Sequence, residues 1–214
     1  DIGELDAAYI PINLFNTTQT ITNLGGNYGL STALKGNYNL TITPPNYFIS
    51  IPSNLPITFS GKDTFITQDF ALQAIQSIDS LSIDITPITN RARPGFVYST
   101  LISYKNIGTN NISSNITLNF DGTKLSYDSS SDHAVTNNIT ALSLSTGNLM
   151  PGEFKSFIAY FKVKPSVIIG DSILSLVSIT NGVIIATDSS KSYVTGSYDP
   201  NDKQATPILT PLQV

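Results

Sequence analysis

The sequence predicts an all-β protein with two tandem β-sandwich domains. β-Branched and aromatic residues alternate with polar residues through most of the 214-residue chain, and a period of two is typical of strands with one buried face. Glycine, proline and asparagine interrupt this pattern at intervals of roughly 8 to 12 residues, as they do in sandwiches. Helical periodicity is weak and confined to FALQAIQSI, residues 70–78.

The first half contains short alternating segments separated by turn residues. Within NYNLTIT, the side chains of Tyr38, Leu40 and Ile42 fall on one face, and the polar residues between them fall on the other. The sequence LGGNYG at 24–29 marks a turn. We expect strands in the segments 7–15, 18–23, 37–45, 48–52, 55–61 and 64–72.

The second half begins near Ser77 and carries longer strands. In RPGFVYSTLISYKNIGT, residues 93–109, the pattern places Phe96, Tyr98, Ile102 and Tyr104 on one face. The segment 139–163 contains two strands around the turn GNLMPGE. Further strands are expected at 81–89, 114–120, 171–179, 182–188 and 191–197.

These segments divide the chain into three parts. Residues 1–76 form a first sandwich without its leading strand, and residues 77–195 form a second sandwich of ordinary domain size. Residues 196–214 are a proline-rich linker or tail, because proline is disfavoured in central strands. We expect the chain, which starts at Asp1 without a signal peptide, to be a fragment excised from a longer protein.

Composition excludes several classes of function. Charged residues make up 12% of the chain, compared with about 25% in an average soluble domain. Basic residues are scattered singly and the net charge is -4, so we expect no nucleic-acid binding. Apolar runs are too short for a membrane span. The chain has no cysteine, which excludes disulfides and thiolate sites.

Three stretches of the second half resemble a known family. They are ARPGFVYSTLISYKNIGT at 92–109, GNLMPGE at 147–153 and VTGSYDPNDKQATP at 194–207. Together they resemble the immunoglobulin-like modules of large surface proteins of Bacteroidetes. The resemblance implies an immunoglobulin-like second sandwich in an adhesin for gliding or attachment, or in a cargo of the type IX secretion system.

The first half resembles a second kind of surface module. DIGE at 1–4, GNYGLSTALKGNYNLTITPP at 26–45 and TQDFAL at 67–72 are similar to the prealbumin-like repeats of bacterial adhesins, the SdrD B-like and Cna B-like modules. The resemblance implies a prealbumin-like sandwich. It also implies a calcium loop, of which Asp1 and Glu4 match only the final positions.

The closing motif SYDPNDK supplies the main candidate metal site. Asp199, Asn201 and Asp202 place three oxygen-bearing side chains within four residues, and calcium takes six to eight oxygen ligands. The alternative is a turn in which these side chains bond nearby backbone N–H groups. The sequence therefore leaves a calcium site and a plain turn open.

Other candidate sites have weaker patterns. Asp79-Ser80-Leu81 and Asp171-Ser172-Ile173 fit a short pattern for O-glycosylation in Bacteroidetes, with Ser80 and Ser172 as acceptors; plain strand-edge residues are the alternative. His133 stands beside Asp132, but no G-x-S-x-G turn accompanies it, so we expect a loop histidine. No pair of carboxylates across a cleft is indicated, so we expect no enzyme activity.

The sequence as a whole predicts a structural role. We expect a non-catalytic stalk or spacer segment at the bacterial cell surface or in a secreted protein. Its expected partners are neighbouring domains of the same chain, surface glycans, or secretion and surface proteins. The alternative is a carbohydrate- or protein-binding accessory module of a secreted hydrolase.

Overall fold

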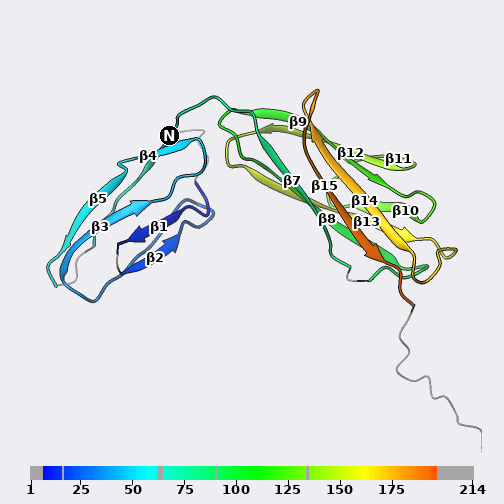
Figure 1. Ribbon diagram of the computed structural model, residues 1–214, viewed down its shortest axis with the longest axis horizontal. Helices are drawn as coiled ribbons and strands as arrows, with labels where there is room; N and C mark the ends of the chain where they lie inside the picture. The colour runs from blue at the N-terminus through cyan, green and yellow to red at the C-terminus, as the bar shows by residue number, and fades with distance from the viewer. Residues whose placement is uncertain (1–6, 16, 62–64, 90, 134, 197–214) are drawn as a thin grey trace, which may run out of the picture.

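The chain folds into β-strands that form two separate groups of sheets (Figure 1). The computed structural model describes residues 7–15, 17–61, 65–89, 91–133 and 135–196. Its strands are β1 Pro11–Leu14, β2 Thr18–Ile21, β3 Gly36–Ile42, β4 Phe48–Ile51, β5 Asn54–Phe59, β6 Ala71–Ala74, β7 Leu81–Pro87, β8 Val97–Asn106, β9 Ile112–Phe120, β10 Leu125–Ser130, β11 Thr136–Asn138, β12 Ala141–Leu149, β13 Phe154–Val163, β14 Ser172–Thr180 and β15 Ile184–Tyr193. The fold class is therefore all-β with tandem sandwiches, as the alternating pattern predicted.

The first sheet group comprises β1 to β6. Its main sheet has the order β2-β1-β3-β5, and β4 pairs with β6 in a two-stranded ribbon. Every pairing is antiparallel. In the described part of this group, Ile12, Leu14, Leu40 and Ile57 form one buried cluster, and aromatic rings such as Tyr38 and Phe59 pack against it.

The second sheet group comprises β7 to β15. One sheet has the order β10-β13-β8-β7 and the other β11-β12-β9-β14-β15. Among the residues that the structure describes, its core contains 24 buried residues, because long strands such as β9 and β14 alternate buried and exposed positions along most of their length. Tyr98 and Phe161 are among the large side chains that are fully buried there.

The two sheets of the second group meet along β7 and β15. The Ile85 N–H on β7 donates to the Asp188 carboxylate on β15 at 2.9 Å, so an otherwise open strand edge gains a partner. Farther along, Ala92 forms a parallel bridge with Val194. These two contacts show that β7 and β15 run in the same direction along the seam.

Some strand predictions differ from the structure. Strands β10 and β11 were not expected. The described part of 64–72 contains no strand before Ala71. Phe96 was predicted on the core face but is exposed, because a turn in which the Phe96 N–H bonds the Arg93 carbonyl precedes β8. The domain boundary between residues 76 and 77 stays a prediction.

Candidate functional site

The loop that follows β8 is built around a buried asparagine. Asn106 has no exposed surface. Its side-chain Nδ2 donates to the carbonyls of Leu149 at 3.0 Å and Asn110 at 2.8 Å. Its Oδ1 accepts the Gly108 N–H at 2.9 Å. Because a buried amide is costly unless it is bonded, these three contacts hold the loop in one conformation.

The same asparagine joins this loop to the turn before β13. The Asn106 N–H donates to the Glu153 carbonyl, and the Gly152 N–H donates to the Asn106 carbonyl. The segments 92–109 and 147–153 thus meet in one hydrogen-bonded unit. We call residues 106–110 and 149–153 together the clamp.

Glu153 stabilises the turn of the clamp through its side chain. Its carboxylate accepts the Met150 N–H at 2.8 Å and pairs with the Lys155 ammonium at 3.0 Å. Burial alone would raise the pKa of the Glu153 carboxyl, but the Met150 N–H and the Lys155 charge outweigh it and hold that pKa below its usual value.

The clamp forms hydrogen bonds to residues 75–80, the segment that joins the two sheet groups. We call this segment the connector. The Ile107 and Gly108 N–H groups both donate to the Ser80 carbonyl at 3.0 Å. The Thr109 hydroxyl accepts the Ile78 N–H at 2.8 Å and donates to the Gln76 carbonyl at 2.6 Å.

Asn110 and Gly108 also contribute to the contact between the clamp and the connector. Asn110 Nδ2 donates to the Ser77 hydroxyl at 2.9 Å and to the Asp79 carboxylate at 2.8 Å. A Cβ added at Gly108 would overlap the Ile78 carbonyl and lie 2.7 Å from the Ser80 nitrogen. Only glycine therefore lets the loop backbone lie this close to the connector.

The connector is also held at its other end. The Ile75 N–H donates to the Tyr47 carbonyl of the first sheet group at 2.9 Å. The next residue, Gln76, is bonded to Thr109 of the second group. Ile75 and Gln76, which are consecutive, are thus hydrogen-bonded to different sheet groups. No residue lies between these two attachment points.

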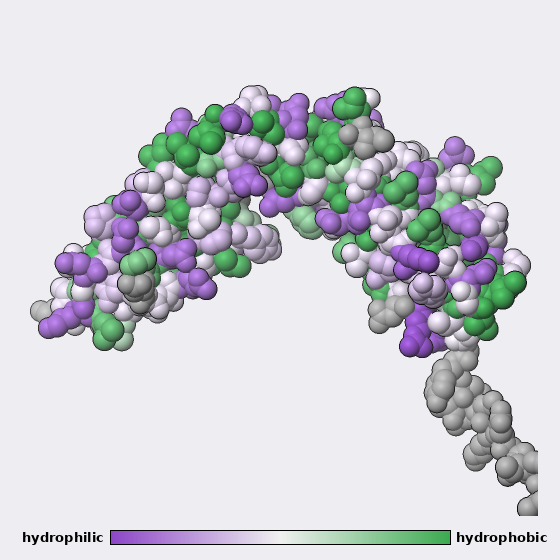
Figure 2. Space-filling view, viewed as in Figure 1, coloured by the Kyte–Doolittle hydropathy of each residue, from purple (hydrophilic) through white to green (hydrophobic). Residues whose placement is uncertain are grey.

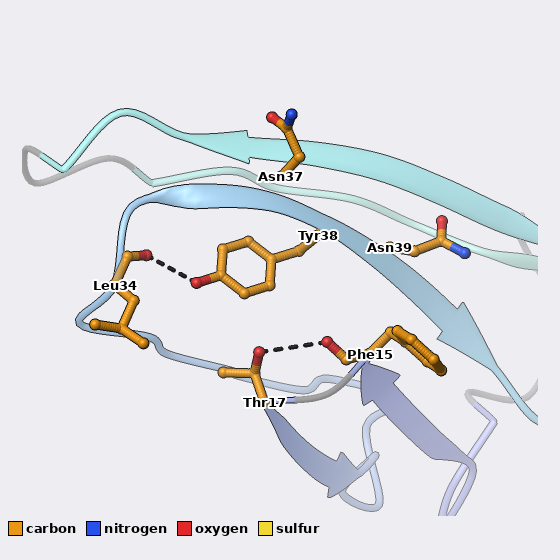
Figure 3. A pocket seen from close by; sticks show the side chains of 6 residues that line it. All are labelled: Phe15, Thr17, Leu34, Asn37, Tyr38 and Asn39. Carbon is orange, nitrogen blue, oxygen red and sulfur yellow. Dashed lines mark hydrogen bonds between the residues drawn. The ribbon is translucent and has the colours of Figure 1, made fainter.

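A shallow depression lies at the end of the first group's main sheet (Figure 3). It has a volume of about 400 Å³ and is lined by Phe15, Thr17, Leu34, Asn37, Tyr38 and Asn39. The Tyr38 hydroxyl donates to the Leu34 carbonyl at 3.0 Å. The lining residues supply aromatic, aliphatic, amide and hydroxyl groups.

The structure places some of the predicted site residues. Ser80 is half-buried in the connector, and Ser172 is half-buried at the start of β14, where its carbonyl accepts the Lys124 ammonium. His133 is exposed. Asp1, Glu4, Asp199, Asn201 and Asp202 lie outside the described residues. Within the described ranges, no group of three or more His, Cys, Asp or Glu side chains is placed to hold a metal ion.

The loop at 106–111, NIGTNN, has the composition of an ordinary turn. The residues that hold the connector, Asn106, Gly108, Thr109 and Asn110, are all common in turns. Their second role depends on a segment about 30 residues earlier in the chain. The sequence does show an Asn two residues before a Gly at the end of a long strand. The same pattern occurs in solvent-exposed turns, so it does not by itself predict contacts to the connector.

The fold is similar to bacterial β-sandwich modules of known structure. A cohesin of ScaC from Acetivibrio cellulolyticus, solved with the ScaB dockerin, is 16% identical with a TM-score of 0.41, over 54% of this chain and 99% of that one. A cohesin module of a family 33 glycoside hydrolase from Clostridium perfringens is 10% identical with a TM-score of 0.40, over 56% and 100%.

The pilin BcpA of Bacillus cereus aligns with more of the chain. It is 15% identical with a TM-score of 0.41, over 92% of this chain and 67% of the pilin. No protein-family model and no curated protein matches the sequence. The described residues form no helix that is long and apolar enough to cross a membrane.

Proposed function

We propose that the chain is a spacer segment of an extracellular bacterial surface protein, in which the clamped connector holds successive sandwiches in a fixed relation. The observation that carries this proposal is the joint itself. Ile75 is bonded to the first sheet group and Gln76 to the second, so bending requires breaking hydrogen bonds. A flexible tether would instead have unattached glycine or serine residues at this point.

The direction of the chain through the second group also suits a spacer. The connector enters at the start of β7, and the described chain ends after β15. Because β7 and β15 run in the same direction along their seam, entry and exit lie at opposite ends (Figure 1). The exit is fixed as well, since the Thr195 N–H donates to the Ala92 carbonyl at 2.8 Å.

The parent protein proposed is an adhesin or a type IX secretion cargo of a Bacteroidetes species. Support comes from the resemblance of residues 92–109, 147–153 and 194–207 to modules of that group. The low charge accords with an exported surface protein that stays soluble through hydroxyl and amide side chains. The test is secretion of the parent protein by strains with and without a working type IX system.

Rigidity of the joint is directly measurable, because the chain has no cysteine and spin labels can be attached at chosen positions. Gln73→Cys and Ser145→Cys replace exposed side chains, one in each sheet group. We expect one narrow distance distribution between the two labels. A broad distribution in the otherwise unaltered chain would contradict the spacer proposal.

A matched pair of glycine variants tests the role of the clamp. Gly108→Ala places a Cβ against the connector backbone, so we expect it to broaden the distance distribution. Gly29→Ala is the control, because a Cβ at Gly29 meets no atom within 4 Å. Equal distributions in both variants would show that the clamp does not fix the joint.

A further inference from the structure

The outward face of the sheet β2-β1-β3-β5 carries a row of amide and hydroxyl side chains. The strand register places Gln19 opposite Asn13, Asn13 opposite Thr41, and Thr41 opposite Asn54. These side chains are exposed or half-buried, whereas Ile12, Leu14 and Leu40 on the other face are buried. Neighbouring members of the row are about 4.8 Å apart, which is the spacing of strands in a sheet.

An exposed aromatic ring stands beside this row. Phe15 follows β1, is 65% exposed, and donates its backbone N–H to the Asn39 carbonyl at 3.0 Å. Phe15 and Asn39 also line the shallow depression (Figure 3). We call the row Gln19, Asn13, Thr41 and Asn54, together with Phe15 and Asn39, the amide face.

Most amides of this face are available for a ligand. Within the described residues, the side chains of Asn13, Gln19, Asn39 and Asn54 make no hydrogen bond to protein groups, and Thr41 makes one weak bond of 3.4 Å to the Asn13 carbonyl. Each amide offers two donors and an acceptor. The face thus presents donors and acceptors in a regular array.

The lack of charged residues on the amide face limits the kinds of partner that it can bind. The amide face has no charged residue, and between residues 7 and 76 the only charged side chains that the structure describes are those of Lys35 and Asp69. Such a surface cannot attract a polyanion or an anionic lipid. Hydrophobic and hydrophilic residues are interspersed over both sheet groups on the side of the molecule shown in Figure 2. The suited partner is uncharged and rich in hydroxyl groups.

We propose that the amide face binds a neutral polysaccharide. Sugar hydroxyls exchange hydrogen bonds with the row of amides and with Thr41, and the apolar face of one sugar ring stacks on Phe15. This activity goes beyond the spacer role and does not depend on it. Because no charged pair is involved, binding is insensitive to salt.

The test is affinity electrophoresis of the whole chain in gels that contain one soluble polysaccharide each. Hydroxyethylcellulose, glucomannan, xyloglucan and dextran are the neutral probes, and alginate is the anionic comparison. We expect retardation by at least one neutral polymer, unchanged between low and high salt, and none by alginate. Retardation by no neutral polymer would overturn the proposal.

Two variants and two controls locate the site. Phe15→Ala removes the stacking ring, and Asn39→Asp replaces two donors with a charge; each is expected to weaken binding about tenfold. The controls in the second group are Phe154→Ala, which replaces a ring that is 61% exposed, and Asn119→Asp on β9, which is also exposed. Equal losses in variants and controls would place binding elsewhere and overturn the assignment.

Two further measurements distinguish polysaccharide binding from a contact between two copies of the chain and from the spacer role. Sedimentation velocity shows whether Phe15→Ala dissociates a dimer; if it does and no polymer binds, the face is a contact between two copies and the proposal fails. The spin-label distances report the spacer role independently. A chain that keeps its narrow distance distribution but binds no polymer retains that role and loses only this proposal.

Discussion

At the scale of single residues, the buried side chain of Asn106 makes three hydrogen bonds. Asn106→Ala leaves the Leu149 and Asn110 carbonyls and the Gly108 N–H without the partners that the amide supplies. We expect a loss of about 2–4 kcal/mol in the free energy of unfolding, since each unpaired buried polar group costs about 1–3 kcal/mol. Urea denaturation measures this loss.

The control for this prediction is Asn115→Ala, because Asn115 is exposed on the outward face of β9. We expect it to change the free energy of unfolding by less than about 0.5 kcal/mol. Similar losses in the two variants would mean that the Asn106 amide contributes no more than a surface residue.

At the scale of elements, the stability that the turn Leu149–Glu153 contributes to the fold depends on pH. The folded state lowers the pKa of Glu153, so its ionised form contributes stability above the pKa of the unfolded chain. That contribution is lost as pH falls through the lower folded pKa. We expect Glu153→Gln to lower the Tm at pH 7, and the difference from the unaltered chain to shrink as the pH falls below about 4.5.

Thermal denaturation between pH 7 and pH 3 measures this difference. Asp84→Asn is the control, because Asp84 is exposed on β7 and its carboxylate makes no hydrogen bond to the residues that the structure describes. A Tm difference for Glu153→Gln that stays constant across the whole range would contradict the argument.

Strands differ in how well their sequences predict them, and the cause is physical. In β14, SILSLVSIT, the core residues Ile173, Val177 and Ile179 alternate with outward-facing residues, and the strand was predicted. In β10, LSYDSS, only Leu125 is buried, and the strand exists because β13 supplies its hydrogen-bond partners. Partners distant in sequence cannot be found from local alternation.

At the scale of the whole molecule, the calcium hypothesis concerns the exit from the second sandwich. Asp199, Asn201 and Asp202 come shortly after the described residues, which end at Gly196. If they hold calcium, the ion raises the Tm beyond the effect of an equal ionic strength of sodium chloride. Asp199→Asn combined with Asp202→Asn then removes the increase. An unchanged Tm would identify the motif as a turn.

The two sheet groups are expected to unfold separately. Their described strands share no pairing, and the buried core of the first group has four residues, compared with 24 in the second. Because stability grows with the apolar area buried, the first group should melt at the lower temperature. We therefore expect two transitions in differential scanning calorimetry.

Core variants assign each transition to its sheet group. Leu14→Ala removes buried methyl groups from the first core, and Ile102→Ala does so in the second, each at a cost of about 2–5 kcal/mol. We expect Leu14→Ala to lower only the first transition and Ile102→Ala only the second. A single transition that both variants lower would show one cooperative unit, and the predicted boundary between residues 76 and 77 would then not separate independent domains. Two transitions that respond separately would show that the hydrogen bonds of the clamp do not couple the stabilities of the two sandwiches.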